Sequence, residues 1–245
     1  MSDSLVLCYH AISPEWTEAL SVTPEALERQ LAWLVRHGWR GVTFTQLVHN
    51  PPRERIVAVT FDDAFASVLE LAHPILSSFG FPATVFAPAA FMSGRQPLSW
   101  PGIDHWARTR AAAELGGMCW EDLGTLAEDG WEIGSHTRTH PRLTGLDDLL
   151  VRSELAGSRQ EIAARTGRPC ESIAYPYGDV DERVATAAKA AGYRAGAALS
   201  SRLTPLGALR WPRVGIFNDD TWARFLLKAA RPTRLLRASC LWPGR

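Results

Sequence analysis

The sequence predicts an α/β fold in which helices cover a parallel sheet. Apolar strand-like runs alternate with helix-like segments along the 245 residues, and no internal repeat or Gly/Ser-rich linker interrupts them. Such alternation is typical of strand–helix–strand units. About seven strands in this length suit a barrel slightly smaller than the eight-stranded kind. An open, doubly wound sheet is the alternative, because periodicity alone does not distinguish the two.

The strands are predicted from short apolar runs that are rich in β-branched and aromatic residues. In chain order seven of them are residues 5–9 (LVLCY), 56–61 (IVAVTF), 83–87 (ATVFA), 131–135 (WEIGS), 172–175 (SIAY), 193–198 (YRAGAA) and 213–217 (RVGIF), and residues 41–44 (GVTF) are a candidate for a further short strand. With 46% apolar residues, the chain has enough material to bury a core between these strands and the helices.

The segments between the strands show helical periodicity. The first helix begins at Thr23, a suitable N-cap before Pro24, and ends at Gly38. A helix follows residue 61, and Pro74 is expected to kink or split it. Further helices are predicted near residues 121–129, 146–166, 181–191 and 219–230. Residues 91–120 begin as a loop and are predicted to be an insertion near a site.

Charge and cysteine usage exclude several classes of protein. The 26 basic and 26 acidic residues balance, so we expect no nucleic-acid partner. The start MSDSLVLCYH does not read as a signal peptide, and no apolar run approaches the length of a membrane span, which favours a cytoplasmic location. The cysteines at 8, 119, 170 and 240 are far apart, which favours free thiols over a zinc–thiolate site.

Polar residues follow four of the predicted strands. They are His10, the pair Asp62 and Asp63, the pair His136 and His140, and the run Tyr175, Pro176 and Tyr177. In a parallel barrel the carboxyl ends of all strands open onto one face. Each motif alone also has a structural explanation; an Asp-Asp pair, for example, can cap a helix and supply its first-turn acid. Their coincidence at four strand ends favours a site.

The residue types in these motifs indicate metal-assisted hydrolysis. His136 and His140 are four apart, so on a helical turn both imidazoles would lie on one side and could share a metal ion. With one carboxylate of the Asp62–Asp63 pair they would form a ligand set that leaves room for water and substrate. The other carboxylate would stay free to accept a proton from water that the cation activates.

Taken together, the motifs TFDD, HTRTH and AYPYG resemble those of the polysaccharide deacetylase family of metal-dependent carbohydrate esterases. The resemblance covers about residues 5–217 and includes CYHAIS and MCWEDLGTLAEDGWEIGSHTRTHP. It implies a distorted (β/α)₇ barrel in a single domain, with residues 221–245 as a basic helix and tail that belong to residues 1–220 or attach loosely to them. It also implies one divalent metal ion, with Zn²⁺ expected first, and hydrolytic removal of acetyl groups from amino sugars.

The resemblance also implies roles for individual residues. Carried over by position, Asp62 is the general base, Asp63, His136 and His140 are the metal ligands, and the backbone N–H of Tyr177 is the oxyanion donor.

The chain departs from the family pattern in two places. Many members have an arginine that holds the base at the position of Ala174, and Arg213 is the candidate to replace it. A late Leu-x-His motif, which often supplies the general acid, is absent from the sequence. The early YHAI resembles a subgroup with rearranged motifs that includes poly-N-acetylglucosamine deacetylases, so His10 is the candidate acid.

The expected substrate is a saccharide precursor, lipid-linked or nucleotide-linked. Between Thr221 and Arg245 the chain has six basic residues and no acid, interspersed with leucine and tryptophan. This composition predicts contact with the inner face of an anionic membrane, the alternative being a solvated helix face and a loose tail. Two other functions remain open: deformylation or another amide hydrolysis on a lipid-linked amino sugar, and a glycan-binding barrel without turnover. The oligomeric state is left open.

Overall fold

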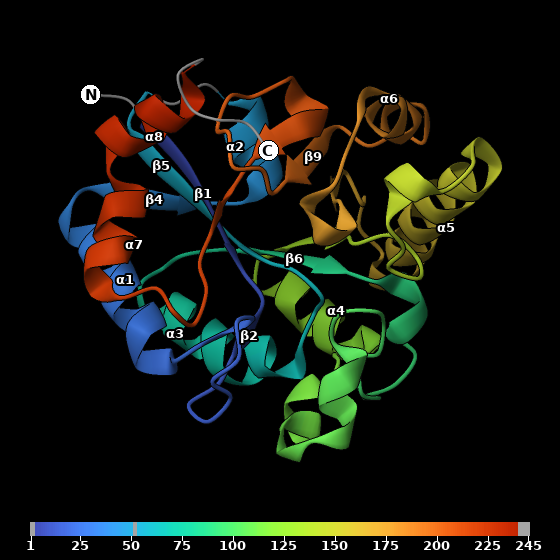
Figure 1. Cartoon of the computed structure of the whole chain (residues 1–245), viewed down its shortest axis with the longest axis horizontal. Coiled ribbons are helices and arrows are strands. Elements are labelled where there is room, and N and C mark those ends of the chain that lie inside the picture. The colour runs from blue at the N-terminus through green and yellow to red at the C-terminus, as the bar shows by residue number, and fades with distance from the viewer. Residues whose placement is uncertain (1–2, 51–52, 240–245) are drawn as a thin grey trace.

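Parallel strands form the centre of the structure, a computed structural model that describes residues 3–50 and 53–239 (Figure 1). The strands of the barrel are β1 Asp3–Tyr9, β5 Arg55–Phe61, β6 Thr84–Ala87, β7 Glu132–Ser135, β8 Ser172–Ala174, β9 Ala195–Ala198, β10 Trp211–Pro212 and β11 Val214–Gly215. They pair in the order β10-β9-β8-β7-β6-β5-β1-β11, all in parallel.

The last strand of the barrel is split in two by Arg213. Its first half, β10, pairs with β9, and its second half, β11, pairs with β1 at the other end of the sheet order. One short segment therefore joins both edges and nearly closes the ring. The predicted (β/α)₇ barrel in a single domain is confirmed, and the open-sheet alternative is wrong.

Helices surround this ring (Figure 1). They are α1 Pro24–Arg36, α2 Phe44–His49, α3 His73–Ser78, α4 Trp120–Glu128, α5 Asp148–Thr166, α6 Glu182–Ala190, α7 Trp222–Ala229 and α8 Arg231–Ala238. Three short strands complete the fold. β4 Trp39–Val42 pairs with the first half of β5, and β2 Ala11–Ile12 pairs with β3 Ser21–Val22. No helix among the described residues is long and apolar enough to cross a membrane.

One predicted strand ends earlier than expected. Residues 41–44 were predicted to be extended, but only Gly41 and Val42 belong to β4, because Thr43 caps α2. The Thr43 side chain accepts the backbone N–H of Gln46, and the Gln46 side chain reaches back to the Thr43 N–H. This reciprocal capping box starts a helix at Phe44. The predicted irregularity near Pro74 is present, because a π-helical turn at Val68–Ala72 leads into α3.

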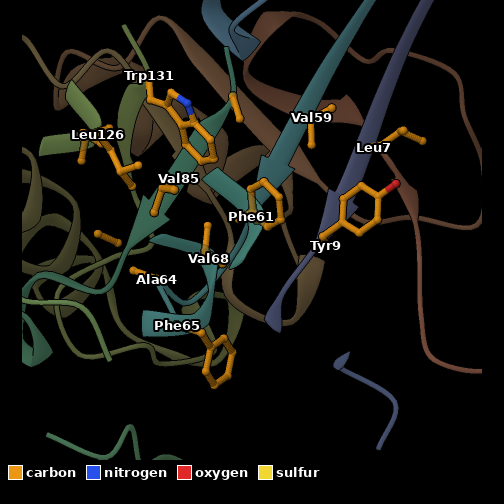
Figure 2. Packing of buried hydrophobic residues seen from close by; sticks show 14 of the residues in the cluster. Leu7, Tyr9, Val59, Phe61, Ala64, Phe65, Val68, Val85, Leu126 and Trp131 are labelled. Atoms are coloured by element: carbon orange, nitrogen blue, oxygen red, sulfur yellow. The ribbon is translucent and has the colours of Figure 1, made fainter. Parts of the chain in front are cut away.

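Side chains point alternately to the two faces of each strand, so the buried apolar residues form two layers, one on each face of the sheet. Leu5, Leu7 and Tyr9 of β1 belong to the larger cluster, which packs against the helices. Figure 2 shows this layer, where Phe61 and Trp131 stack with ring centroids 5.8 Å apart. Val6 faces the opposite way and packs with Ala58, Phe86, Ala174 and Ala197. These mostly small inner residues leave room inside the barrel for larger polar side chains.

The two C-terminal helices pack on the barrel. Phe225 of α7 is fully buried, and Lys228 bonds Asp220 at 2.6 Å. Arg234 of α8 bonds Asp3 of β1 at 2.5 Å. The last part of the helix and tail predicted over residues 221–245, namely residues 240–245 with Cys240, lies outside the described residues.

Candidate active site

The pocket at the carboxyl ends of the strands has a volume of about 300 Å³. Its walls come from the loops after β1, β5, β7, β8 and β9, from the insertion after β6 and from Phe217. Six of the seven predicted site residues line it: His10, Asp62, Asp63, His136, His140 and Tyr177. The seventh, Arg213, is buried beside Asp62.

The two adjacent aspartates separate because the backbone changes direction between them. Asp62 extends β5, with its N–H donating to Tyr9 O at 3.0 Å. Asp63 has φ 72° and Ala64 has φ 55°, both in the left-handed region. This turn aims Asp63 at the histidines while Asp62 faces the barrel interior. The repulsion expected of neighbouring carboxylates is therefore offset by different partners for each.

Asp63 meets both histidines at one carboxylate oxygen. Its Oδ1 lies 3.3 Å from His136 Nε2 and 3.3 Å from His140 Nε2, and all three side chains are buried. His136 Nδ1 is 2.8 Å from Ala174 O, which fixes the ring and places the Nδ1 proton on the side away from Asp63. The three atoms thus converge on one point.

This arrangement fits a divalent metal ion. Ligands at 2.0–2.2 Å around a tetrahedral or octahedral ion are about 2.8–3.6 Å apart, and the two distances from Asp63 Oδ1 to the histidines fall in this range. With its proton on Nδ1, a neutral His136 offers a lone pair to Asp63, so nothing bridges these two atoms unless a cation lies between them. Asp63 Oδ1 and His140 Nδ1 are also buried and have no hydrogen-bond partner among the described residues.

The pKa shifts of two of the three residues, Asp63 and His140, favour the forms that bind a metal ion. Burial would raise the pKa of Asp63, but the two histidines outweigh it and hold that pKa far below its usual range. Burial lowers the pKa of His140, which favours the neutral ring that a metal requires. Burial also acts to lower the pKa of His136, but Asp62 and Asp63 outweigh it and raise that pKa. A bound cation would oppose this last effect.

The histidine pair does not lie on a helical turn. Residues 136–140 form a loop after β7, in which Thr137 has φ 65° and His140 has φ 60°. Among the described residues, the five non-glycine residues with positive φ are Asp63, Ala64, Thr137, His140 and Tyr177, and all are in or beside the three motifs. Each such conformation costs about 1–3 kcal/mol, so the surrounding structure must hold it in place.

Arg213 forms a two-pronged ion pair with Asp62. Its Nη1 lies 2.6 Å from Asp62 Oδ1 and its Nη2 lies 2.7 Å from Oδ2, and Nη1 also bonds Thr60 Oγ1 at 3.1 Å. Burial would raise the pKa of Asp62, but the Arg213 guanidinium lowers it to about 2. Arg213 thus binds both carboxylate oxygens of Asp62, which is the contact expected of a residue that replaces the arginine missing at Ala174.

His10 lies at the pocket wall, beyond the end of β1. Its ring stacks on Phe217 at 6.3 Å, and its Nδ1 is buried without a hydrogen-bond partner among the described residues. Burial lowers its pKa, although Asp63 and Asp62 act to raise it. The neutral ring is therefore favoured at rest, and a role as an acid requires that His10 gain a proton during turnover.

A second group of metal-binding residue types lies beside the first. Side-chain atoms of Cys8, His10 and Asp62 are within 4.8 Å of one another, and the Cys8 thiol donates to Asp62 Oδ2 at 3.5 Å. Because Arg213 already places a positive charge on Asp62, a cation is disfavoured here. The Asp63 group is the better metal centre.

Tyr177 and the predicted insertion form the opposite wall. The Tyr177 hydroxyl donates to Pro101 O at 2.8 Å, and its ring lies 5.0 Å from the His140 ring. Trp100 stacks on His140 at 4.2 Å and an angle of 21°. Residues 91–120 thus reach the site, as expected of an insertion near it.

Cys8 and Trp100 contact predicted site residues but were not themselves predicted as site residues. Cys8 could have been found, because it lies two positions before His10 and side chains two apart face the same side of a strand. Nothing in the sequence distinguishes Trp100 from the other tryptophans, since its contact with His140 depends on the path of the insertion.

Comparison with known proteins supports a shared origin for these motifs. A family model described as polysaccharide deacetylase matches residues 49–196. A Bacillus subtilis protein, YxkH, named as a candidate polysaccharide deacetylase, is 27% identical over 198 residues, which are 78% of this chain and 62% of that protein. A Staphylococcus aureus poly-beta-1,6-N-acetyl-D-glucosamine N-deacetylase (strain N315) is 23% identical over 221 residues, covering 84% of this chain and 71% of that protein.

Solved structures share the fold over nearly the whole chain. The deacetylase PplD of Streptococcus pyogenes has a TM-score of 0.76 at 21% identity, covering 94% of this chain and 99% of the other. IcaB of Ammonifex degensii has a TM-score of 0.69 at 22% identity, covering 98% of each chain. The barrel is therefore similar in these proteins.

Proposed function

Because this chain belongs to the polysaccharide deacetylase family, we propose that it hydrolyses the N-acetyl group of an amino sugar in a saccharide. The observation that carries this proposal is the contrast between two adjacent acids. Asp63 converges with two imidazoles on a cation site, while Asp62 is held ionised by Arg213 beside it. The relative named a poly-beta-1,6-N-acetyl-D-glucosamine N-deacetylase supports an N-acetylated sugar as substrate.

The proposed cofactor is one divalent metal ion, with Zn²⁺ as the first candidate. Asp63, His136 and His140 would hold it, since two neutral imidazoles and one carboxylate form a set that zinc accepts in hydrolytic enzymes. When bound, the ion polarises the acetyl carbonyl and makes water available as a nucleophile near neutral pH.

In the proposed reaction, different residues of the chain accept a proton, donate a proton and stabilise the developing charge. Asp62 accepts the proton of the attacking water, and Arg213 fixes the direction of its carboxylate. The backbone N–H of Tyr177 donates to the carbonyl oxygen as negative charge develops there. His10, which also lines the pocket, takes up a proton from solvent and delivers it to the leaving nitrogen. Each role follows from a position in the pocket or, for Arg213, beside it.

Acetate release from N-acetylated chito- and β-1,6-linked oligosaccharides tests the proposal. We expect release that a chelator abolishes and added Zn²⁺ restores. Asp62→Asn should remove turnover but keep the metal, whereas Asp63→Asn should lose both. Formate release from N-formyl sugars without acetate release would indicate a deformylase. Saccharide binding without any acyl release would indicate a glycan-binding barrel.

A cytoplasmic location and membrane contact through residues 221–245 belong to the same proposal. Leu227, Leu235 and Leu236 are exposed on α7 and α8. Three of the basic residues there are paired with acids, which reduces the charge left for lipid headgroups: Arg224 with Asp219, Lys228 with Asp220 and Arg234 with Asp3. Sedimentation with anionic vesicles at low and high salt tests the contact; recovery in the supernatant at both would exclude it.

A further inference from the structure

A carboxylate of α5 lies beneath the loop that carries both histidines. Glu154 Oε2 accepts the backbone N–H of Arg138 at 2.8 Å and that of Thr139 at 2.9 Å. Its other oxygen, Oε1, accepts the Thr139 hydroxyl at 2.7 Å. One side chain therefore binds three donors in the short segment between His136 and His140.

This segment needs external support. Thr137 and His140 are both left-handed, so the loop between the ligands lacks the hydrogen bonds of a helix. Neutral contacts fix part of it: Thr137 O accepts Ala89 N–H at 3.1 Å, and Thr137 Oγ1 accepts His140 N–H at 3.1 Å. The N–H groups of Arg138 and Thr139 take no part in these contacts. Both donate to the Glu154 carboxylate instead.

A second set of contacts, one helical turn after Glu154, fixes α5 relative to the loop. Ser158 follows Glu154 by four residues, so both side chains lie on one face of α5. Ser158 Oγ is buried and bonds Ser135 Oγ at 2.9 Å, and Ser135 Oγ accepts the Thr137 N–H at 3.0 Å. Tyr193 completes this network with its hydroxyl 3.1 Å from Ser158. Glu154 is therefore held in register with the loop that it binds.

We propose that Glu154 is a positioning residue that holds residues 136–140 in the conformation in which both imidazoles can bind the metal ion. This inference rests on the proposed metal centre and adds to it a residue outside the three motifs. Partners that orient metal ligands commonly change metal affinity when they are replaced, although they do not touch the ion. Glu154 would act in this way through the backbone.

The test is the affinity of the metal-free chain for Zn²⁺, measured by competition with a chromophoric chelator. Glu154→Ala removes the three bonds but keeps a residue that favours helix. We expect its affinity to fall about 10–100-fold. Glu154→Gln keeps an acceptor oxygen for the two N–H groups, so its affinity should stay close to that of the wild type. Excess Zn²⁺ should restore acetate release to Glu154→Ala.

A matched control is available on the same helix. Glu161 lies 3.8 Å from the Arg138 side chain and has no recorded bond to the loop backbone among the described residues. Glu161→Ala should bind Zn²⁺ as the wild type does. Thr139→Val removes one of the three bonds and should give a smaller loss in the same direction. Thermal unfolding with chelator present should be similar for all variants, which separates loop positioning from loss of the fold.

The outcomes separate this inference from the proposed function. Zn²⁺ binding by the wild type with equal affinity in Glu154→Ala would overturn the role of Glu154 and leave the metal centre intact. An equal loss in Glu161→Ala would also overturn it, since the effect would then be one of charge on α5. No Zn²⁺ binding by the wild type would overturn the metal centre, and this inference with it.

Discussion

The most consequential contact at the scale of single residues is the buried pair of Asp62 and Arg213. Both oxygens of Asp62 receive guanidinium N–H groups, and the Arg213 side chain is inaccessible to solvent. A buried carboxylate would normally gain a proton easily, but this pair keeps Asp62 ionised. The proposed base is therefore ionised over a wide pH range.

Replacing Arg213 should move the acid limit of activity. In Arg213→Met, burial acts on Asp62 without the opposing charge, so its pKa rises from about 2. Since Asp62 works only when ionised, we expect turnover to be lost at a higher pH as the solution is acidified. The measurement is kcat/KM against pH for both proteins. An unchanged acid limb would contradict the role of Arg213.

The same substitution should also destabilise the fold. Removing one partner of a buried ion pair typically costs about 3–5 kcal/mol, because a charge is left unpaired. The double variant Asp62→Asn with Arg213→Met lacks that charge and should be more stable than Arg213→Met alone. Urea unfolding at neutral pH measures the difference between the two.

His10 offers a second test at this scale. His10→Ala should keep Zn²⁺ affinity, since His10 lies outside the Asp63 group. It should lower kcat about 10²–10⁴-fold, the usual contribution of a general acid. Full turnover in this variant would assign the acid to another group.

At the scale of elements, Asp122 ties the insertion to α4. It accepts Arg95 Nη2 at 2.6 Å, Arg95 Nε at 3.1 Å and the Cys119 N–H at 2.9 Å. Burial would raise the pKa of Asp122, but Arg95 and the Cys119 N–H outweigh it and lower that pKa. The link thus holds the start of the segment that brings Trp100 to His140.

The depressed pKa of Asp122 makes this contribution depend on pH. Its stabilisation is fully present above the unfolded pKa, near 3.9, and is lost as the pH falls through the lower folded value. Asp122→Asn should therefore lower stability by about 1–3 kcal/mol at pH 7 and by less in acid. Glu128→Gln, an exposed change on the same helix, is the control for urea unfolding at both pH values. A loss that does not depend on pH would contradict this account.

The sequence predicts elements well where local signals decide them. Thr23 caps α1 as expected, and the strands end where the polar motifs begin. Thr43 was taken for part of a strand because β-branched residues suit both strands and N-caps. The spacing of the histidine pair indicated a shared metal ion but not the shape of its loop, because spacing carries no information on left-handed residues. The Arg213–Asp62 contact could be offered only as a hypothesis, since it joins positions 151 residues apart.

At the scale of the whole molecule, the metal should link distant parts of the chain. Asp63 follows β5 and the two histidines follow β7, so a bound ion joins loops that are separate in the sequence. We expect Zn²⁺ to raise the thermal midpoint, with a stabilisation of about 2.7 kcal/mol at a concentration one hundred times the dissociation constant.

Two variants check the origin of that stabilisation. Asp63→Asn should abolish the Zn²⁺-dependent rise, because it removes a ligand. Asp62→Asn should retain the rise, because its partner is Arg213. Scanning calorimetry with chelator and with Zn²⁺ gives both values. A rise that survives in Asp63→Asn would place the ion elsewhere.

The split strand β10–β11 has a further consequence for how the molecule is made. Arg213 lies in the last segment of the ring, so a nascent chain leaving the ribosome carries Asp62 long before its cationic partner exists. Until then the aspartate must stay hydrated or take up a proton, and the two edges of the growing sheet stay open to other polypeptides. Completion of the ring and pairing of the Asp62 carboxylate with its guanidinium thus become one late event of synthesis.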